Sequence, residues 1–209
     1  YYYSDILFFT PQIILTFFVV SIYSWRLTYN WARRWTGLAD EDWRYGMLAQ
    51  QTGKWYPLVN FLGIHLFPTV AVFIASIPLY YLIVPIHPFS ILNYVGVVVA
   101  LFGVWIEWLA DYQLHQFKVA NKDGISVLRF GIWKYIRHPN YLGEISFWFG
   151  LAMMGYSDYM GWPLFTGAAI ILLMFMFISI PMMQKRLVVS KAGYDDYIKS
   201  SWKLIPYIF

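Results

Sequence analysis

The chain has 209 residues, of which 60% are apolar, 22% are aromatic and only 12% are charged. A soluble domain carries about twice that share of charged residues, and a mean hydropathy of +0.52 is too high for one water-soluble core. The composition therefore excludes soluble globular, disordered and disulfide-rich secreted proteins and indicates an integral membrane protein. The absence of cysteine also excludes thiol chemistry.

Long stretches with few or no charges predict five membrane-spanning helices. The stretches 6–25 and 55–106 hold 20 and 52 uncharged residues, and 145–184 holds 40 residues with Asp158 as its only charge. A bilayer core takes about 20 residues of helix to cross, so the first stretch crosses once and the other two cross twice. The expected spans are 5–25, 57–83, 89–110, 140–156 and 161–182.

Proline and turn residues place the breaks between these spans. Two prolines within 84–88 remove backbone donors, and the next turn is expected at 156–159. Pro68 and Pro78 lie inside a span and are expected to kink it rather than end it. We therefore expect an all-α, polytopic helix bundle that forms a single membrane domain over 1–209.

The fifteen Lys and Arg residues test this topology. Five lie in each of the segments 26–54, 118–137 and 185–203, whereas the two short turns hold none. With five spans, all three basic segments lie on one side of the membrane, and the positive-inside rule places that side in the cytoplasm. The chain starts with Tyr1-Tyr2-Tyr3, without Met or a basic signal region, so we expect a truncated N-terminus.

The first basic segment alternates arginines with aromatic residues. Arg26, Asn30 and Arg33 share one face at helical spacing. An arginine fork binds phosphate oxygens in pairs and stacks on flat rings, so this face suits a phosphate-bearing ligand. The alternative interpretation is a Trp and Arg belt at the membrane interface.

A second pattern places Glu107, Asp111 and His115 one turn apart at the end of a span. Carboxylates at membrane depth are costly unless they face a polar cavity. The alternatives are that Glu107 already lies among the lipid head groups, or that a metal ion is shared here. With only four histidines in the chain, we predict no metal site.

The third pattern gathers Arg137, His138, Asn140 and Glu144 around Pro139, which suits the first turn of a helix. Backbone amides at a helix start attract anions. A simple connection between helices does not require so many polar side chains within eight residues, so this is the strongest local indication of a functional site.

This last segment, 134–144, resembles the signature of the steroid 5-alpha-reductase superfamily, particularly its bacterial branch. The likeness extends to 107–114, 41–45, 194–197 and the terminal 204–206. The short Arg-His-Pro-x-Tyr element is also similar to that of isoprenylcysteine carboxyl methyltransferases, which use S-adenosylmethionine.

The resemblance implies a seven-helix bundle, here lacking its first two helices, that holds NADPH in a cavity facing the cytoplasm of a bacterial inner membrane. It implies hydride transfer to the carbon–carbon double bond of a lipophilic enone. The catalytic residues it suggests are Tyr29 and Glu107. The cofactor-binding residues it suggests are Arg33, Arg44, Asp111, Lys118, Arg137, His138, Asn140, Tyr141, Glu144 and Arg186.

Two other functions stay open at this point. A membrane methyltransferase usually carries paired glutamates after its last span, where this chain has Met183 and Gln184. A non-catalytic lipid-binding protein could keep these motifs for structural reasons alone. The expected partners are membrane lipid and a lipophilic small molecule, without nucleic acid; the sequence specifies neither the substrate nor the oligomeric state.

Overall fold

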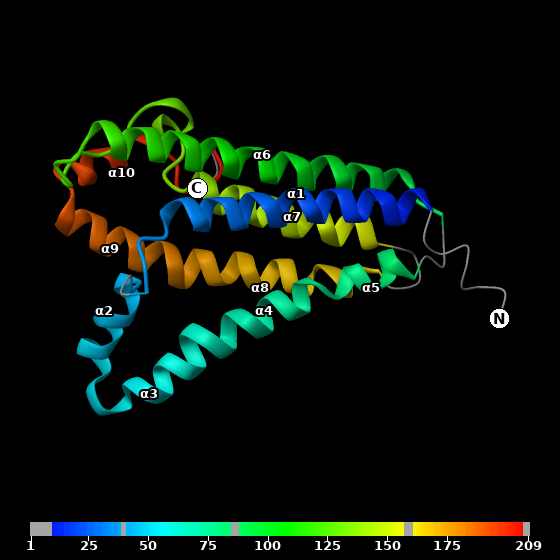
Figure 1. Cartoon of the computed structure of the whole chain (residues 1–209), viewed down its shortest axis with the longest axis horizontal. Helices are drawn as coiled ribbons and strands as arrows, with labels where there is room; N and C mark the ends of the chain where they lie inside the picture. The colour runs from blue at the N-terminus through cyan, green and yellow to red at the C-terminus, as the bar shows by residue number, and fades with distance from the viewer. Residues whose placement is uncertain (1–9, 39–40, 85–87, 157–160, 207–209) are drawn as a thin grey trace.

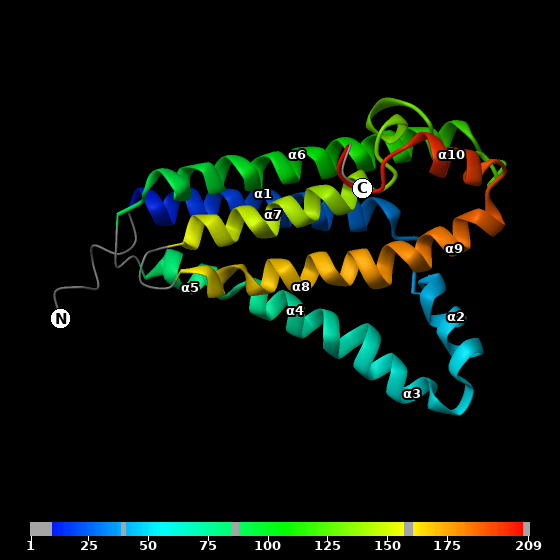
Figure 2. The same cartoon turned by 180° about the vertical axis from the view of Figure 1, so that it is seen from behind.

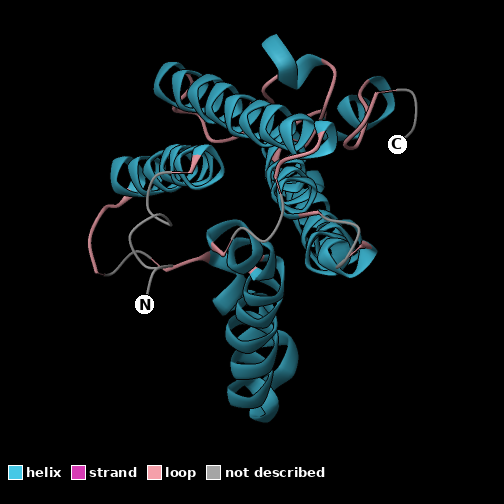
Figure 3. Ribbon diagram, turned by 90° about the vertical axis from the view of Figure 1, so that its right-hand side faces the viewer, coloured by secondary structure: helices cyan, strands magenta, loops and turns pink. Residues whose placement is uncertain are grey.

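The computed structural model describes residues 10–38, 41–84, 88–156 and 161–206. Within these ranges the chain is helical and forms no strand, which confirms the all-α class; an isolated bridge joins Ile136 to Trp202. Figure 3, which looks along the bundle, shows the helices packed side by side.

The helices follow one another along the chain, and the connection 121–138 between α6 and α7 is the longest one among the described residues (Figure 1). The α-helices are α1 (Pro11–Arg34), α2 (Trp43–Thr52), α3 (Tyr56–Val59), α4 (Phe67–Ala75), α5 (Ile77–Ile83), α6 (Ile91–Ala120), α7 (Pro139–Gly155), α8 (Thr166–Met174), α9 (Ile180–Ser190) and α10 (Tyr194–Ser200). The π-helical segments are Asn60–Leu66 and Phe175–Ser179, and the 3-10 segments are Gly53–Trp55, Gly131–Lys134 and Trp162–Phe165.

Three described stretches are long and apolar enough to cross a membrane: Trp43–Ile83, Ile91–Ala120 and Trp162–Ser190. The other two expected spans correspond to α1, which carries three arginines, and to α7, which has 17 residues. The five-span topology therefore stays a prediction. Parts of the first expected span and of both expected turns lie outside the described residues.

The helices run several residues past the apolar windows that predicted them. Three of them end at Arg34, Ala120 and Ser190 rather than at 25, 110 and 182. Lys, Arg, Gln and Glu favour helix as much as most apolar residues do, so a helix continues where its hydrophobic pattern stops. As a result Arg26 and Arg33, which lie beyond the expected span 5–25, are part of α1 and share one helix, as their spacing indicated.

The prolines within the second expected span act as predicted. Pro78 follows an interruption of the helix at Ser76, and Pro68 follows the π-helical segment. Neither ends the stretch Trp43–Ile83, which continues as one helical run. A proline lacks the amide hydrogen for its i−4 partner, which explains the local change of helix type.

Helices α6 and α7 pack with their backbones in direct contact, because glycines line the seam between them. A Cβ added to Gly103 would lie 2.5 Å from the carbonyl oxygen of Gly143, and one added to Gly143 would lie 2.4 Å from Cγ of Glu107. Gly96 and Gly150 are equally close to the opposite helix. Small residues at such a seam let two membrane helices approach closely.

A buried asparagine joins the other ends of the same two helices. Asn93 donates from its side-chain amide to the carbonyl oxygens of Met153, Met154 and Tyr156, at 3.1, 2.9 and 2.7 Å. Its Oδ1 accepts from the backbone of Ser90 at 2.6 Å and so caps α6. The start of α6 is therefore fixed to the end of α7.

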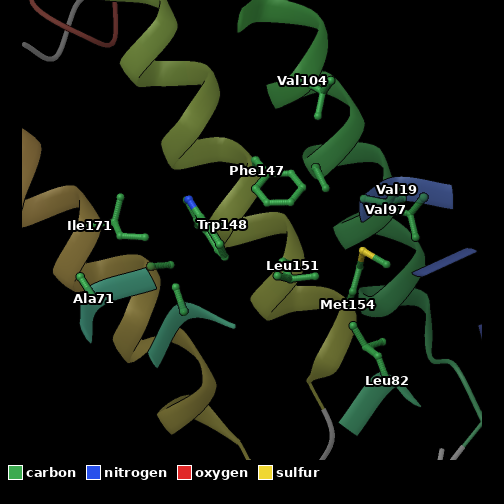
Figure 4. Packing of buried hydrophobic residues seen from close by; sticks show 13 residues of the cluster. Val19, Ala71, Leu82, Val97, Val104, Phe147, Trp148, Leu151, Met154 and Ile171 are labelled. Carbon is green, nitrogen blue, oxygen red and sulfur yellow. The ribbon is translucent and has the colours of Figure 1, made fainter. Parts of the chain in front are cut away.

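The apolar core lies between α1, α6, α7 and α8, and α4 and α5 also contribute buried residues to it. Phe147 and Leu151 of α7 are each 1% exposed and pack near Val104 of α6 and Ile171 of α8 (Figure 4). Above Phe147, the ring of Tyr23 stacks at 3.7 Å between centroids. Tyr23 therefore connects the apolar core to the charged side chains of α1, α6 and α7.

The basic segments gather at one end of the bundle. The C-terminal ends of α1, α6 and α9 and the short helix α2 all lie toward this end, and α5 and the start of α6 lie toward the other (Figures 1 and 2). We call it the basic end. Helices α3 and α4 slant away from α8 and α9 toward the basic end, where α2 lies beside α9 (Figure 1).

Candidate functional site

A cluster of four charged side chains joins three helices near the basic end. Arg26 of α1 forms an ion pair with Glu107 of α6 and donates a hydrogen bond to Asp111 Oδ2 at 3.2 Å. Its other terminal nitrogen lies 3.8 Å from Oε2 of Glu144 on α7. We call Arg26, Glu107, Asp111 and Glu144 the charge cluster.

Two aromatic side chains complete the surroundings of Glu144. Tyr23 donates from its hydroxyl to Glu144 Oε1 at 2.7 Å, and Trp148 donates from its indole nitrogen to the same oxygen at 2.9 Å. Because Tyr23 and Arg26 stand one turn apart on α1, both face α7. The phenol, the guanidinium and the carboxylate therefore meet at one place.

The charge cluster has a buried centre, with Asp111 and Glu144 partly exposed, and its charges do not balance. Arg26 is 5% exposed and Glu107 is 2% exposed. Three carboxylates around one guanidinium give a formal charge of −2. The Nε of Arg26 and the Oε1 of Glu107 have no hydrogen-bond partner. A buried ionic group without a partner is costly, so the cluster has capacity for a proton or for a polar ligand.

A small hollow opens beside the cluster between α1 and α6, with an empty volume of about 220 Å³. Arg33 contributes an unpartnered Nε to it and donates to Asn30 Oδ1 at 3.2 Å and to the backbone oxygen of Asp111 at 3.4 Å. Much of this volume is open to solvent, and the enclosed part has room for about one water molecule. The residues that line it are Arg26, Tyr29, Asn30, Arg33, Trp108, Asp111 and Tyr112.

The residues that start α7 divide between two tasks. The guanidinium of Arg137 donates to the carbonyl oxygens of Ile198 and Ser201, and its backbone amide donates to Trp202 at 2.8 Å. Arg137 is 8% exposed and thus holds the C-terminal segment in place. The structure does not bring its guanidinium to the charge cluster.

His138 lies at the same helix start and is 4% exposed. Burial, together with the charges of Arg137 and Lys203, lowers the pKa of His138 to about 3, so its ring is neutral. It stacks on Tyr141, which in turn stacks on Phe175 with 4.5 Å between ring centroids. His138 Nε2 also lies 3.4 Å from the side-chain nitrogen of Gln184.

The remaining predicted residues lie outside the cluster. Asn140 is half-buried, and its side chain makes no hydrogen bond to the described residues. Lys118 is exposed near the end of α6, within electrostatic range of Asp111 and Arg186. Arg44 pairs with Asp42 at 2.8 Å in the first turn of α2.

The structure thus brings together Glu107, Asp111 and Glu144, with Arg33 at the adjoining hollow. Tyr29 lines that hollow and is 47% exposed. The guanidinium carbon of Arg33 lies 5.6 Å from the ring centroid of Tyr29. Tyr29 has none of the carboxylate contacts that Tyr23 has.

Sequence reasoning did not assign Tyr23 and Trp148 to the site, and it placed Arg26 on a phosphate-binding face rather than in ion pairs with carboxylates. The available signal was the spacing of Tyr23 and Arg26 by three residues at the end of an apolar stretch, and the spacing of Trp148 from Glu144 by four. Among the described residues, no group of three His, Asp or Glu side chains is placed to bind a metal ion.

The fold and the cluster together define a helical protein of membrane-crossing length with a buried ionic centre near its basic end. The chain belongs to the DUF1295 family, described as a protein of unknown function, whose profile matches residues 7–201. Searches of curated proteins and of solved structures found no match.

Proposed function

We propose that this chain is a membrane-embedded, NADPH-dependent reductase of the carbon–carbon double bond in a lipophilic enone. The observation that carries the proposal is the hydrogen bond from Tyr23 to the partly buried carboxylate of Glu144, beside the buried guanidinium of Arg26. A phenol and a cation held together in this way are suited to protonate and stabilise a carbonyl oxygen as negative charge develops on it.

The proposal includes five membrane crossings, with the charge cluster facing the cytoplasm of a bacterial inner membrane. Support comes from the three segments that hold all fifteen Lys and Arg residues, which gather toward one end of the bundle (Figure 1). In this topology α1 and α7 are the two further spans. Their polar groups face each other across the cluster and so avoid lipid.

The donor set fits NADPH in chemistry, although the hollow admits only a small polar group. Arginine and lysine side chains at the basic end suit its phosphates, and the unpartnered Nε of Arg33 and Arg26 are donors that a carboxamide oxygen would satisfy. Acceptors for amide and ribose groups are available on Asp111 and Glu144. The residues that would hold the phosphates are Arg33, Arg44, Lys118 and Arg186.

When bound, NADPH would supply a hydride to the β-carbon of the enone. The chain's own residues then have separate tasks. Tyr23 would turn the hydroxyl proton that it donates to Glu144 in the free protein toward the enone oxygen and transfer it there. Arg26 would stabilise the negative charge on that oxygen, and Trp148 would keep Glu144 beside the phenol. Glu107, through its ion pair, holds Arg26 in position.

An S-adenosylmethionine-dependent methyltransferase is the second candidate, and one observation favours it. The formal charge of −2 in the charge cluster would attract a cationic sulfonium group. Against it, Gln184 contacts His138 at the place where methyltransferases usually carry an acid.

Ligand-dependent thermal stability distinguishes the two functions. NADPH at about 100 times its Kd should stabilise the purified protein by about 2.7 kcal/mol, and S-adenosylmethionine should not. Glu144→Ala and Asn140→Ala should reduce that stabilisation. Ser146→Ala on the same helix, whose hydroxyl contacts only a backbone oxygen, should not. Stabilisation by S-adenosylmethionine alone would contradict the proposal.

Tyr23→Phe tests the chemical step. The variant keeps the stack on Phe147 and loses only the hydroxyl, so we expect NADPH affinity to be unchanged and single-turnover reduction of an enone to fall by about 10²-fold or more. Tyr29→Phe is the matched control. Full activity in Tyr23→Phe would remove Tyr23 as the proton donor.

A further inference from the structure

The first turn of α2 holds an ion pair with the geometry of a phosphate contact. Arg44 donates from Nε to Oδ1 of Asp42 at 2.8 Å and from Nη2 to Oδ2 at 3.0 Å. Both carboxylate oxygens therefore occupy the guanidinium fork. A phosphate presents two oxygens to an arginine in the same way.

A second arginine and an aromatic ring lie close to this pair. The charge of Arg186, on α9, acts on Asp42, and its guanidinium lies over the ring of Trp43 at 4.4 Å. The charges of Arg44 and Asp42 also act on the hydroxyl of Tyr141 on α7. Side chains from three helices thus converge at the basic end, where α2 lies beside α9 (Figure 1).

The position of Asp42 has a local cause and a second consequence. Its side chain also accepts from the backbone amide of Arg44 at 2.9 Å, as an N-cap of α2. Partial burial alone raises the pKa of Asp42, but the hydrogen bonds from Arg44 outweigh it and lower the pKa below its usual value. Asp42 is therefore an anion held by Arg44, and Arg186, which lies over the neighbouring Trp43, acts on it at longer range.

We propose that Arg44 and Arg186 form a subsite for a ligand phosphate, and that Asp42 occupies this subsite as an internal competitor when no ligand is bound. The inference rests on the proposed function and deepens it, because the phosphate would be one of those of NADPH. A ligand phosphate has to displace the carboxylate from the fork. Because the ion pair between Asp42 and Arg44 is exposed, we expect it to lower the affinity for a ligand phosphate by up to about fivefold.

Asp42→Asn separates the competition from the capping role. Asparagine caps a helix as well as aspartate does, so α2 keeps its start while the competing charge is removed. Glu41→Gln is the matched control, because it neutralises an adjacent exposed carboxylate that has no ion pair among the described residues. Arg44→Gln, alone and combined with Asp42→Asn, tests the fork itself.

The full chain in detergent micelles is titrated calorimetrically with 2′,5′-ADP, a phosphomonoester that undergoes no redox reaction, and with NADPH. We expect Asp42→Asn to bind 2′,5′-ADP about three to five times more tightly than the wild type. Glu41→Gln should match the wild type, and Arg44→Gln should abolish the gain.

The outcomes distinguish this inference from the proposed function. If the wild type binds NADPH and Asp42→Asn leaves both affinities unchanged or weaker, Asp42 is not a competitor and only the inference fails. If the gain for 2′,5′-ADP is present but NADPH does not bind any variant, the subsite stands and the reductase proposal fails. Failure of 2′,5′-ADP to bind any variant overturns the subsite.

Discussion

Replacing Arg26 by glutamine tests whether the charge cluster holds the helices together. The substitution removes the single guanidinium that contacts three carboxylates and changes the formal charge of the cluster from −2 to −3. Because Glu107 is 2% exposed, water cannot solvate its charge. Removing one partner of a buried ion pair costs about 3–5 kcal/mol.

For a chain of this length, each kcal/mol shifts the Tm by roughly 2–4 °C. Arg26→Gln should therefore lower the Tm of the purified protein by roughly 6–20 °C, measured by the intrinsic fluorescence of its tryptophans in detergent. Lys54→Gln is the matched control, since it removes the same charge from an exposed position in Gly53–Trp55, outside the cluster.

The double variant Arg26→Gln, Glu107→Gln separates charge from packing. It returns the formal charge to −2, so most of the lost stability should return. A Tm for Arg26→Gln that stays within about 2 °C of the wild type would refute the reasoning, because Arg26 would then not compensate the carboxylates. If the double variant is less stable than Arg26→Gln, the loss of stability in Arg26→Gln comes from packing rather than from charge.

Two further predictions concern stability. Gly143→Ala should disturb the packing of α6 on α7, because the new Cβ would lie 2.6 Å from the backbone oxygen of Gly103, and we expect the free energy of unfolding to fall by about 1–3 kcal/mol. Gly63→Ala is the control and should not destabilise the protein, because a Cβ there has nothing within 4 Å. Equal Tm values for the two variants would contradict this prediction. Because the pKa of His138 is lowered to about 3, the unfolded chain binds a proton below about pH 6.5 that the folded chain does not bind. Stability should therefore fall with pH between about 6.5 and 3, by about 2 kcal/mol at pH 5, and His138→Gln should reduce this acid sensitivity; an unchanged pH profile would show that another group causes it.

The positions of the long helices could be predicted because charge is absent where a helix meets apolar surroundings. The ends of these helices could not be predicted from the apolar pattern. Helix α1, for example, continues through Arg26 and Arg33, because arginine favours helix although it is not apolar. The glycine seam could not be predicted either, because a glycine in the sequence permits a close approach of another helix but does not identify Gly103 as the partner of Gly143.

In the site, spacing along one helix sufficed for Glu107 and Asp111, which stand one turn apart on α6. The contact of Tyr23 with Glu144 joins residues 121 positions apart, and no local pattern distinguishes this tyrosine from the other seventeen. Arg137 shows the opposite case. Its motif indicated ligand binding, yet its guanidinium contacts carbonyl groups more than 60 residues away.

The contact of backbone with backbone between α6 and α7 decides which parts of the protein can move. At Gly103 and Gly143 the main chains of the two helices lie in direct contact, so neither helix can rotate or slide there without a collision of main-chain atoms. The pair is a fixed frame that carries Glu107, Asp111 and Glu144. Any rearrangement that widens the hollow must therefore come from a shift of α1, and chemical cross-linking of α1 to α6 should stop ligand exchange while the frame itself stays intact.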